Sequence, residues 1–189
     1  LAGGDINASR GGIVSIDGQI ILGAVGGEGT LGLNFDNDSP IFEFPEGLSR
    51  ADVSLTSNAG FLVSGSGGGD IAITARNIEI SEGSSLFAGI FSGLGSLDAQ
   101  AGDISISANS LSVIGESSID SRTSGLGNGA NVSVSANNLS LTNGGSISAS
   151  TFGQGDAGDI NIFSNNVEID GGDDGILTGL FAQVGQGAT

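Results

Sequence analysis

The 189-residue chain contains no cysteine, methionine, tryptophan, tyrosine or histidine, and its only cationic residues are Arg10, Arg50, Arg76 and Arg122. The lack of cysteine excludes a disulfide framework and a thiolate metal site, and it leaves the redox compartment open. Without histidine, cysteine or lysine, a catalytic nucleophile would lack its usual general base. These absences argue against most kinds of enzyme active site.

Positive charge is scarce as well. Four Lys and Arg residues stand against 21 Asp and Glu residues, which gives a net charge of −17. Such a surface repels nucleic acid and anionic membranes, because few cations are available to neutralise phosphates. No apolar run approaches the ~20 residues that a membrane span requires. We therefore expect neither nucleic-acid binding nor membrane insertion.

What the chain does contain is glycine and a regular apolar pattern: 36 glycines, and 38% apolar residues. Four units follow one another and open at Asp70, Asp103, Asn131 and Asp159, with spacings of 28 to 33 residues. Self-similarity at such a period is typical of a solenoid. The high glycine content and the lack of a 3.6-residue period exclude helix.

Within each unit, apolar residues alternate with small polar ones in three short bursts, which is a strand signal. Coiled into a solenoid, equivalent residues stack one rung apart, ~4.8 Å along the axis. The sequence predicts an all-β, right-handed parallel β-helix with about three short strands per rung and about six rungs. Aliphatic columns should point inward and serines such as Ser105 and Ser133 outward. The burst residues are Ile71/Ile73, Ile104/Ile106, Val132/Val134 and Ile160/Ile162; then Ile78/Ile80, Leu111/Val113, Leu139/Leu141 and Val167/Ile169; then Leu86, Ile119, Ile147 and, after a one-residue insertion, Ile176.

The chain is expected to form one domain, residues 1–189. Residues 70–189 make regular rungs of 28–33 residues, whereas residues 1–69 make irregular rungs, of which one opens at Asp5 in the manner of Asp70. Both prolines, Pro40 and Pro45, lie in an insertion over residues 36–50 that should bulge or loop at the edge of the coil.

The ends of the chain indicate a fragment. No signal peptide is recognisable before the first rung, so one has been removed or the chain is internal to a longer one. Gly185-Gln186-Gly187 repeats Gly153-Gln154-Gly155, and neither end carries a proline-rich or charged cap. Open strand edges recruit other strands. We expect an internal stretch of a longer solenoid, or end-to-end self-association.

Three columns of side chains are candidate sites. Asp70, Asp103, Asn131 and Asp159 could hold a calcium-like cation or could cap turns by accepting backbone N–H bonds, and we favour capping. Asn109, Asn137 and Asn165, beside Asn77, Asn138 and Asn166, should form amide ladders at turns. Phe91, Phe152 and Phe181, with Ser124 in the fourth rung, could be a sugar-stacking platform, or a stacked corner of the core, which we favour because Trp and Tyr are absent.

Catalysis has the weakest support. Paired carboxylates hydrolyse glycosides, and β-helical pectin-degrading enzymes use Asp clusters with Arg. Asp173-Asp174 is the densest pair but is more typical of a solvated turn. A cleft could form only at the insertion, where Asp36, Asp38, Glu43 and Glu46 precede Arg50. An ice-binding solenoid would need a flat Thr-x-Thr face, and these outward positions are mostly serine. We predict no catalytic, cofactor or metal site.

Four segments resemble filamentous-haemagglutinin-like exoproteins, the passengers of two-partner secretion, of the cyanobacterial type. They are GEGTLGLNFDND (27–38), FPEGLSRADVSLT (44–56), DAQAGDISISANSLSV (98–113) and LTNGGSISASTFGQGDAGDINI (141–162), and residues 148–155 are the most specific. The resemblance implies a β-helical passenger, export through an outer-membrane barrel partner, and a place outside the cell or at its surface. It implies a structural adhesin or filament segment, with cell-surface glycans or neighbouring cells as partners. The alternative is a polysaccharide-processing β-helix enzyme.

Overall fold

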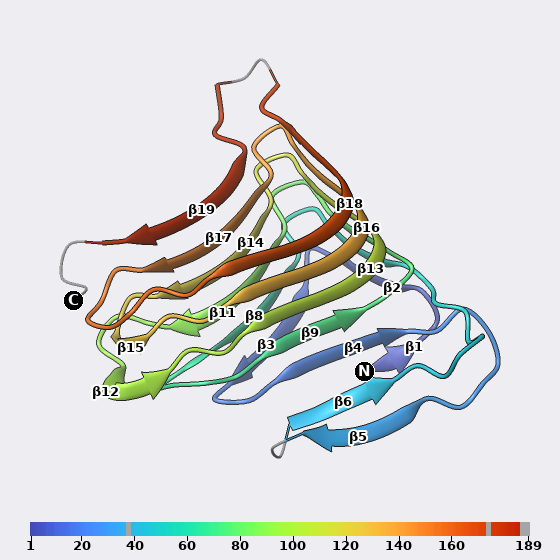
Figure 1. The fold of residues 1–189 in the computed structure, drawn as a ribbon, viewed down its shortest axis with the longest axis horizontal. Coiled ribbons are helices and arrows are strands. Elements are labelled where there is room, and N and C mark those ends of the chain that lie inside the picture. Colours follow the sequence, from blue (N-terminus) through green and yellow to red (C-terminus); the bar gives the residue numbers. More distant parts are fainter. Residues whose placement is uncertain (37–38, 173–174, 186–189) are drawn as a thin grey trace.

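The computed structural model describes residues 1–36, 39–172 and 175–185, and it contains strands but no helix over these ranges. Figure 1 shows the strands stacked side by side, with the N-terminal strands at one end of the stack and β18 and β19 at the other. Neighbours in the two large sheets are all parallel and come from successive turns of the chain. The chain is therefore a parallel β-helix, as its repeat predicts.

Each turn of the coil contributes to three faces. The first face holds β1 (Ala2–Gly3), β4 (Ile20–Ala24), β9 (Ile71–Thr74) and the first halves of β13 (Ile104–Ile114), β16 (Val132–Thr142) and β18 (Ile160–Asp170). The second face holds β2 (Ile6–Ser9), β7 (Val53–Thr56), β10 (Asn77–Ile80) and the second halves of the same long strands. The third face holds β3 (Gly12–Ile16), β8 (Gly60–Gly65), β11 (Ser85–Ile90), β14 (Ser118–Thr123), β17 (Ser146–Thr151) and β19 (Gly179–Val184). Six strands on the third face correspond to six rungs.

Three strands per rung is correct for the early rungs only. In the last three rungs the first two bursts merge into one strand of 11 residues. The ladder runs on to Ala108, which pairs with Ala136, omits Asn109, and resumes at Ser110, which pairs with Asn138. A bend at this point keeps the three faces while reducing the number of separate strands.

The aliphatic columns fill the interior. Ile73, Ile106 and Val134 lie in register on the first face and are all buried. Ser105, between two buried isoleucines, is exposed. A fully buried aliphatic side chain contributes about 1.5–3 kcal/mol relative to an exposed one. The predicted inward positions are confirmed for the columns up to the fifth rung, which supply the core, whereas Val167 and Ile169 on the last described rung are about half exposed.

Two register predictions are wrong. Asp5 does not open a rung as Asp70 does, because Ile6 pairs with Val53 on the second face, and Asp5 therefore aligns with Asp52. The residue that aligns with Asp70 in that part of the coil is Gln19. At the other end, Leu180 pairs with Ile147, and Ile176 lies before β19 and is exposed. In both cases a short sequence motif resembled one from another rung, but the two motifs occupy different positions in their rungs.

The insertion is longer than the predicted 36–50. It begins after β4, where Val25 bridges Arg50, and it contains an antiparallel hairpin of β5 (Gly32–Asp36) and β6 (Ser39–Glu43). In Figure 1 this hairpin projects from the lower edge of the stack. Leu31, Leu33 and Phe35 alternate as they would in a rung strand, so the sequence does not mark where the coil is left. A second small pair, β12 (Gly95–Gln100) and β15 (Leu126–Asn128), is parallel.

Candidate functional site

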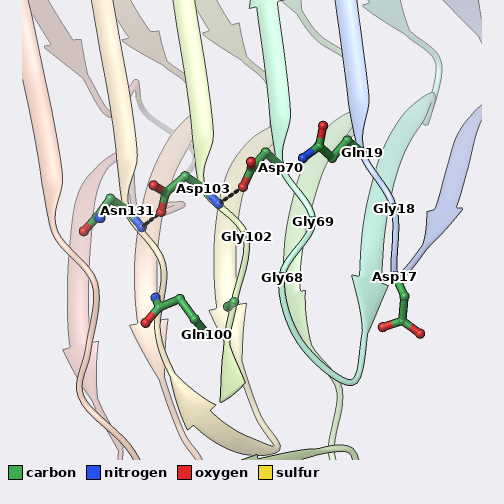
Figure 2. A pocket seen from close by; sticks show the side chains of 11 residues that line it. Asp17, Gly18, Gln19, Gly68, Gly69, Asp70, Gln100, Gly102, Asp103 and Asn131 are labelled. Carbon is green, nitrogen blue, oxygen red and sulfur yellow. Dashed lines mark hydrogen bonds between the residues drawn. The ribbon is translucent and has the colours of Figure 1, made fainter. Parts of the chain in front are cut away.

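The acidic column lies at the corner where each rung enters the first face. The register of Ile71, Ile104, Val132 and Ile160 stacks the four residues that precede them. The Asp103 N–H donates to Asp70 Oδ1 at 2.9 Å, and the Asn131 N–H donates to Asp103 Oδ1 at 2.7 Å (Figure 2). The Asp159 N–H donates to Asn131 Oδ1 at 2.9 Å. The predicted turn caps are confirmed as a ladder of side chain to backbone hydrogen bonds.

At each corner, the side-chain hydrogen bond follows directly after the last backbone hydrogen bond of the parallel sheet. The N–H of Ile71 donates to the backbone carbonyl of Asp103 at 2.9 Å, and the N–H of Asp103 then turns to the Asp70 side chain. These bonds lie at exposed corners, and the side chain supplies the acceptor that pairs with the N–H of the next rung. Asn131 accepts the same bond with an amide oxygen. The position therefore requires an acceptor rather than a negative charge.

A glycine precedes Asp70, Asp103 and Asp159, whereas Ala130 precedes Asn131, and the glycines have a steric reason. A Cβ built on Gly102 would lie 1.9 Å from the Gly69 carbonyl oxygen, and one on Gly158 would lie 1.9 Å from the Ala130 carbonyl oxygen. At these two positions a side chain would collide with the backbone of the preceding rung, so glycine permits the close approach. The recurring Gly-Asp pair is thus a packing and capping unit of the solenoid.

The ladder is predicted to work without metal. Over the ranges that the structure describes, no group of three or more His, Cys, Asp or Glu side chains is placed to hold a metal ion. We expect a chelator such as EDTA to leave the thermal unfolding transition unchanged, because the carboxylates stabilise turns through N–H bonds. The measurement is Tm by circular dichroism with and without chelator. A fall of many degrees that calcium reverses would contradict this prediction.

A polar pocket of about 560 Å³ lies beside the ladder, and Asp17, Asp70 and Asp103 are among its lining residues. Asp17 Oδ1 accepts hydrogen bonds from the N–H and hydroxyl of Ser66, at 2.7 and 3.2 Å. In Figure 2 the Asp17 side chain points away from Asp70 and Asp103. General acid–base hydrolysis needs two carboxylates that flank one bond. These carboxylates are instead engaged in separate turns.

The hairpin also shapes a groove against the first face, with a volume of about 750 Å³. A cleft therefore does form at the insertion, but Glu43 and Glu46 are not among its lining residues. Glu43 accepts a hydrogen bond from Asn34, and Arg50 lies over the Phe44 ring and donates to Ser107. Hydroxyl and apolar side chains form most of the lining, and among the described residues only Asp70 and Asp103 contribute carboxylates to it. The Asp36 side chain, Asp38 and Asp173-Asp174 lie outside the described residues.

The asparagine ladders are confirmed. Asn137 Nδ2 donates to Asn109 Oδ1 at 2.8 Å, and Asn165 Nδ2 donates to Asn137 Oδ1 at 3.3 Å. In the neighbouring column, Asn166 Nδ2 donates to Asn138 Oδ1 at 2.9 Å. Asn109, Asn137 and Asn165 lie inside the long strands and not in left-handed turns, which corrects the expected conformation. Their role is to link rungs.

An ion pair between Arg76 and Asp52, at the corner where each rung enters the second face, was not predicted from the sequence. Arg76 Nε and Nη2 donate to the two carboxylate oxygens of Asp52 at 2.9 and 2.6 Å. Asp52 also accepts the N–H of Asn77, and its own N–H donates to Asp5. The hydrogen bonds from Arg76 lower the pKa of Asp52 from its usual value. Asp5, Asp52 and Asn77 form one column, but the sequence does not reveal this column until the register of the strands is known.

The predicted phenylalanine column is partly wrong. Phe91 and Phe152 share a column with Ser124, but Phe181 pairs with Ser148, which lies four residues before Phe152. Phe91 is 42% exposed and Phe152 is 40% exposed, so neither is a corner of the core. Phe91 stacks on Phe87 with ring centroids 5.5 Å apart, and the Arg122 guanidinium lies 4.8 Å from the Phe152 ring centre. Both rings are partly exposed to solvent and directly follow strands of the third face.

No protein-family model, curated protein or solved structure matches the chain. Over the described residues, the structure has no helix long and apolar enough to cross a membrane.

Proposed function

We propose that this chain is a non-catalytic structural segment of a secreted or cell-surface protein, in which a rigid β-helix presents its outer faces for adhesion. The observation that carries the proposal is that the carboxylates of the corner column accept hydrogen bonds from backbone N–H groups. Asp70 and Asp103 each accept a backbone N–H from the next rung, and Asn131 replaces an aspartate without loss of the bond. A column in which an amide substitutes for a carboxylate is built for stacking rather than for proton transfer.

The groove beside the hairpin favours contact over hydrolysis. Its floor consists of outward side chains of the first face, including Ser105, Ser107 and Ser133, and Pro40 and Ile41 form one wall. A polysaccharide-processing enzyme would need two facing carboxylates at such a place. Hydroxyl groups can bind a partner through hydrogen bonds, and the two carboxylates of the groove, Asp70 and Asp103, each accept a backbone N–H of the next rung. The resemblance to two-partner secretion passengers leads us to propose export through an outer-membrane barrel partner.

The proposal is tested by accessibility on the cell that makes the protein. An antibody raised against residues 1–189 should label intact, unpermeabilised cells or the medium, and brief external protease should remove the cell-bound label. An antibody against a cytoplasmic enzyme should label only after permeabilisation and serves as the control. Labelling that requires permeabilisation would refute a surface location. Release of reducing ends from a panel of polysaccharides by the purified chain would favour the enzyme instead.

We also propose that the open edges of the stack associate end to end. On the last rung, Val167, Ile169 and Val184 are each about half exposed or more, and the described strands pair with β18 and β19 on one side only. Unpaired edges over apolar side chains recruit further strands. The net charge of −17 opposes lateral contact more than axial pairing. We expect the isolated chain to form lengthwise oligomers by light scattering; a monomer at high concentration would contradict this.

A further inference from the structure

A pocket on the third face arises from the sizes of side chains in three successive rungs. Outward columns on this face align Asp120 with Ser148 and Phe181, and Arg122 with Ser150 and Gln183. The two serines of the middle rung are small, whereas their neighbours on both sides are large. The result is a depression with a serine floor and walls from the fourth and sixth rungs, about 10 Å apart at ~4.8 Å per rung.

Leu177, from the segment before β19, and Phe152 also line this depression, whose volume is about 270 Å³. The volume is slightly below the ~300–1,000 Å³ of sites for drug-sized ligands. The space is therefore suited to one ring-sized group rather than to a long chain. Arg122 lies over the Phe152 ring, which holds the guanidinium at the end of the pocket.

Asp120 is the polar group that needs a partner. Its Oδ1 is buried without a hydrogen-bond partner. Such an orphaned acceptor calls for a water, a proton or a ligand donor. Rotation about the Cβ–Cγ bond is soft, so the carboxylate can turn this oxygen toward the pocket that its side chain lines. Burial raises the pKa of Asp120, and the Ser148 hydroxyl and the Arg122 charge offset this only in part.

We infer that this pocket, between Asp120, Arg122 and Phe181, binds a single neutral pyranose ring of a glycan. A pyranose has hydroxyl donors for the carboxylate, hydroxyl acceptors for the guanidinium and Ser150, and an apolar face of C–H groups for Phe181 and Leu177. An acidic sugar is disfavoured, because Asp120 and the net charge of −17 repel it. The inference rests on the proposed surface role, to which it adds a ligand class.

The test uses the ¹⁵N-labelled chain and a panel of methyl glycosides of glucose, galactose, mannose and N-acetylglucosamine at millimolar concentrations. At least one should shift the amide signals of Ser148, Ser150 and Phe181 in a saturable way, and methyl glucuronide should bind more weakly. Asp120→Asn should weaken binding about tenfold, since a hydrogen bond to a charged group is worth that much or more. Phe181→Ala should weaken binding as well, because it removes the apolar surface that contacts the C–H face of the sugar. Phe91→Ala, which removes an exposed ring outside the pocket, should leave binding unchanged.

Measuring the Tm of the Asp120→Asn variant shows whether a loss of binding is caused by a loss of folding. A raised folded-state pKa means that the stability from Asp120 is present below its unfolded pKa and is lost as pH rises through the folded value. Asp120→Asn should therefore raise Tm at pH 7, with a gain that shrinks toward pH 4. No saturable shift with any glycoside, or binding by Asp120→Asn and Phe181→Ala as tight as that of the parent chain, would overturn the inference. Surface labelling of cells would be unaffected by either result, so the two proposals fail separately.

Discussion

Ile106→Asp is expected to destabilise the chain by more than about 4 kcal/mol, enough to remove the cooperative thermal transition or to lower it by many degrees. Ile106 is 3% exposed and lies in β13 between buried residues of the rungs on either side. The substitution removes a buried aliphatic group and places a carboxylate without a partner in the core, and each change is costly. Thermal unfolding followed by circular dichroism measures the effect.

Ser105→Asp is the matched control. Ser105 is the neighbouring residue on the same strand, but its side chain is exposed. The same carboxylate at this position remains in water, so we expect a change of about 0.5 kcal/mol or less. Equal losses in the two variants, or no loss in either, would mean that the assignment of inward and outward columns is wrong.

Gly102→Ala is expected to destabilise by about 1–3 kcal/mol, although it adds only one methyl group. The new Cβ would lie 1.9 Å from the carbonyl oxygen of Gly69 and 2.2 Å from its carbonyl carbon. Both atoms belong to the backbone of the preceding rung, so relief requires the rungs to separate. Separation would also lengthen the bond from the Asp103 N–H to Asp70. Chemical denaturation gives the change in free energy of unfolding.

Gly67→Ala provides the comparison within the turn that precedes Asp70. A Cβ at Gly67 would lie 3.5 Å from the Ala99 Cβ, which is an ordinary van der Waals contact. We expect this variant to unfold within about 0.5 kcal/mol of the parent chain. If Gly102→Ala were as mild as Gly67→Ala, close packing of backbones at the Gly-Asp corner could not be the reason for glycine there.

The regular half of the fold could be predicted because it repeats. Within residues 70–169, each aliphatic column was assigned from spacing alone, and the register agrees for pairs such as Leu111 with Leu139. Stacking of equivalent residues is the property of a solenoid that makes this possible. The hydrogen-bonded role of the Asp70 column followed from the same register.

The errors occur where rungs change length. Around the hairpin and before β19, extra residues shift the register, and a local match then points to the wrong residue: Asp5 for Gln19, Ile176 for Leu180. The number of residues in an irregular turn is not encoded in a period-two pattern. Phe181 was assigned to the wrong column for this reason, and the pocket beside Asp120 was missed. That pocket depends on which large and small side chains become neighbours across rungs.

The central claim is the parallel stacking of rungs in this register, and a disulfide tests it most directly because the chain has no cysteine. Ser105 pairs with Ser133 across β13 and β16, and Ser135 lies two residues further along β16. Parallel neighbours lie ~4.8 Å apart, within the range of Cα separations that a disulfide spans, whereas a shift of two residues adds ~6.6 Å along the strand. Mild oxidation followed by mass spectrometry should show an intramolecular disulfide in Ser105→Cys/Ser133→Cys and free thiols in Ser105→Cys/Ser135→Cys. A disulfide in the second variant, or none in the first, would contradict the register and the β-helix built on it.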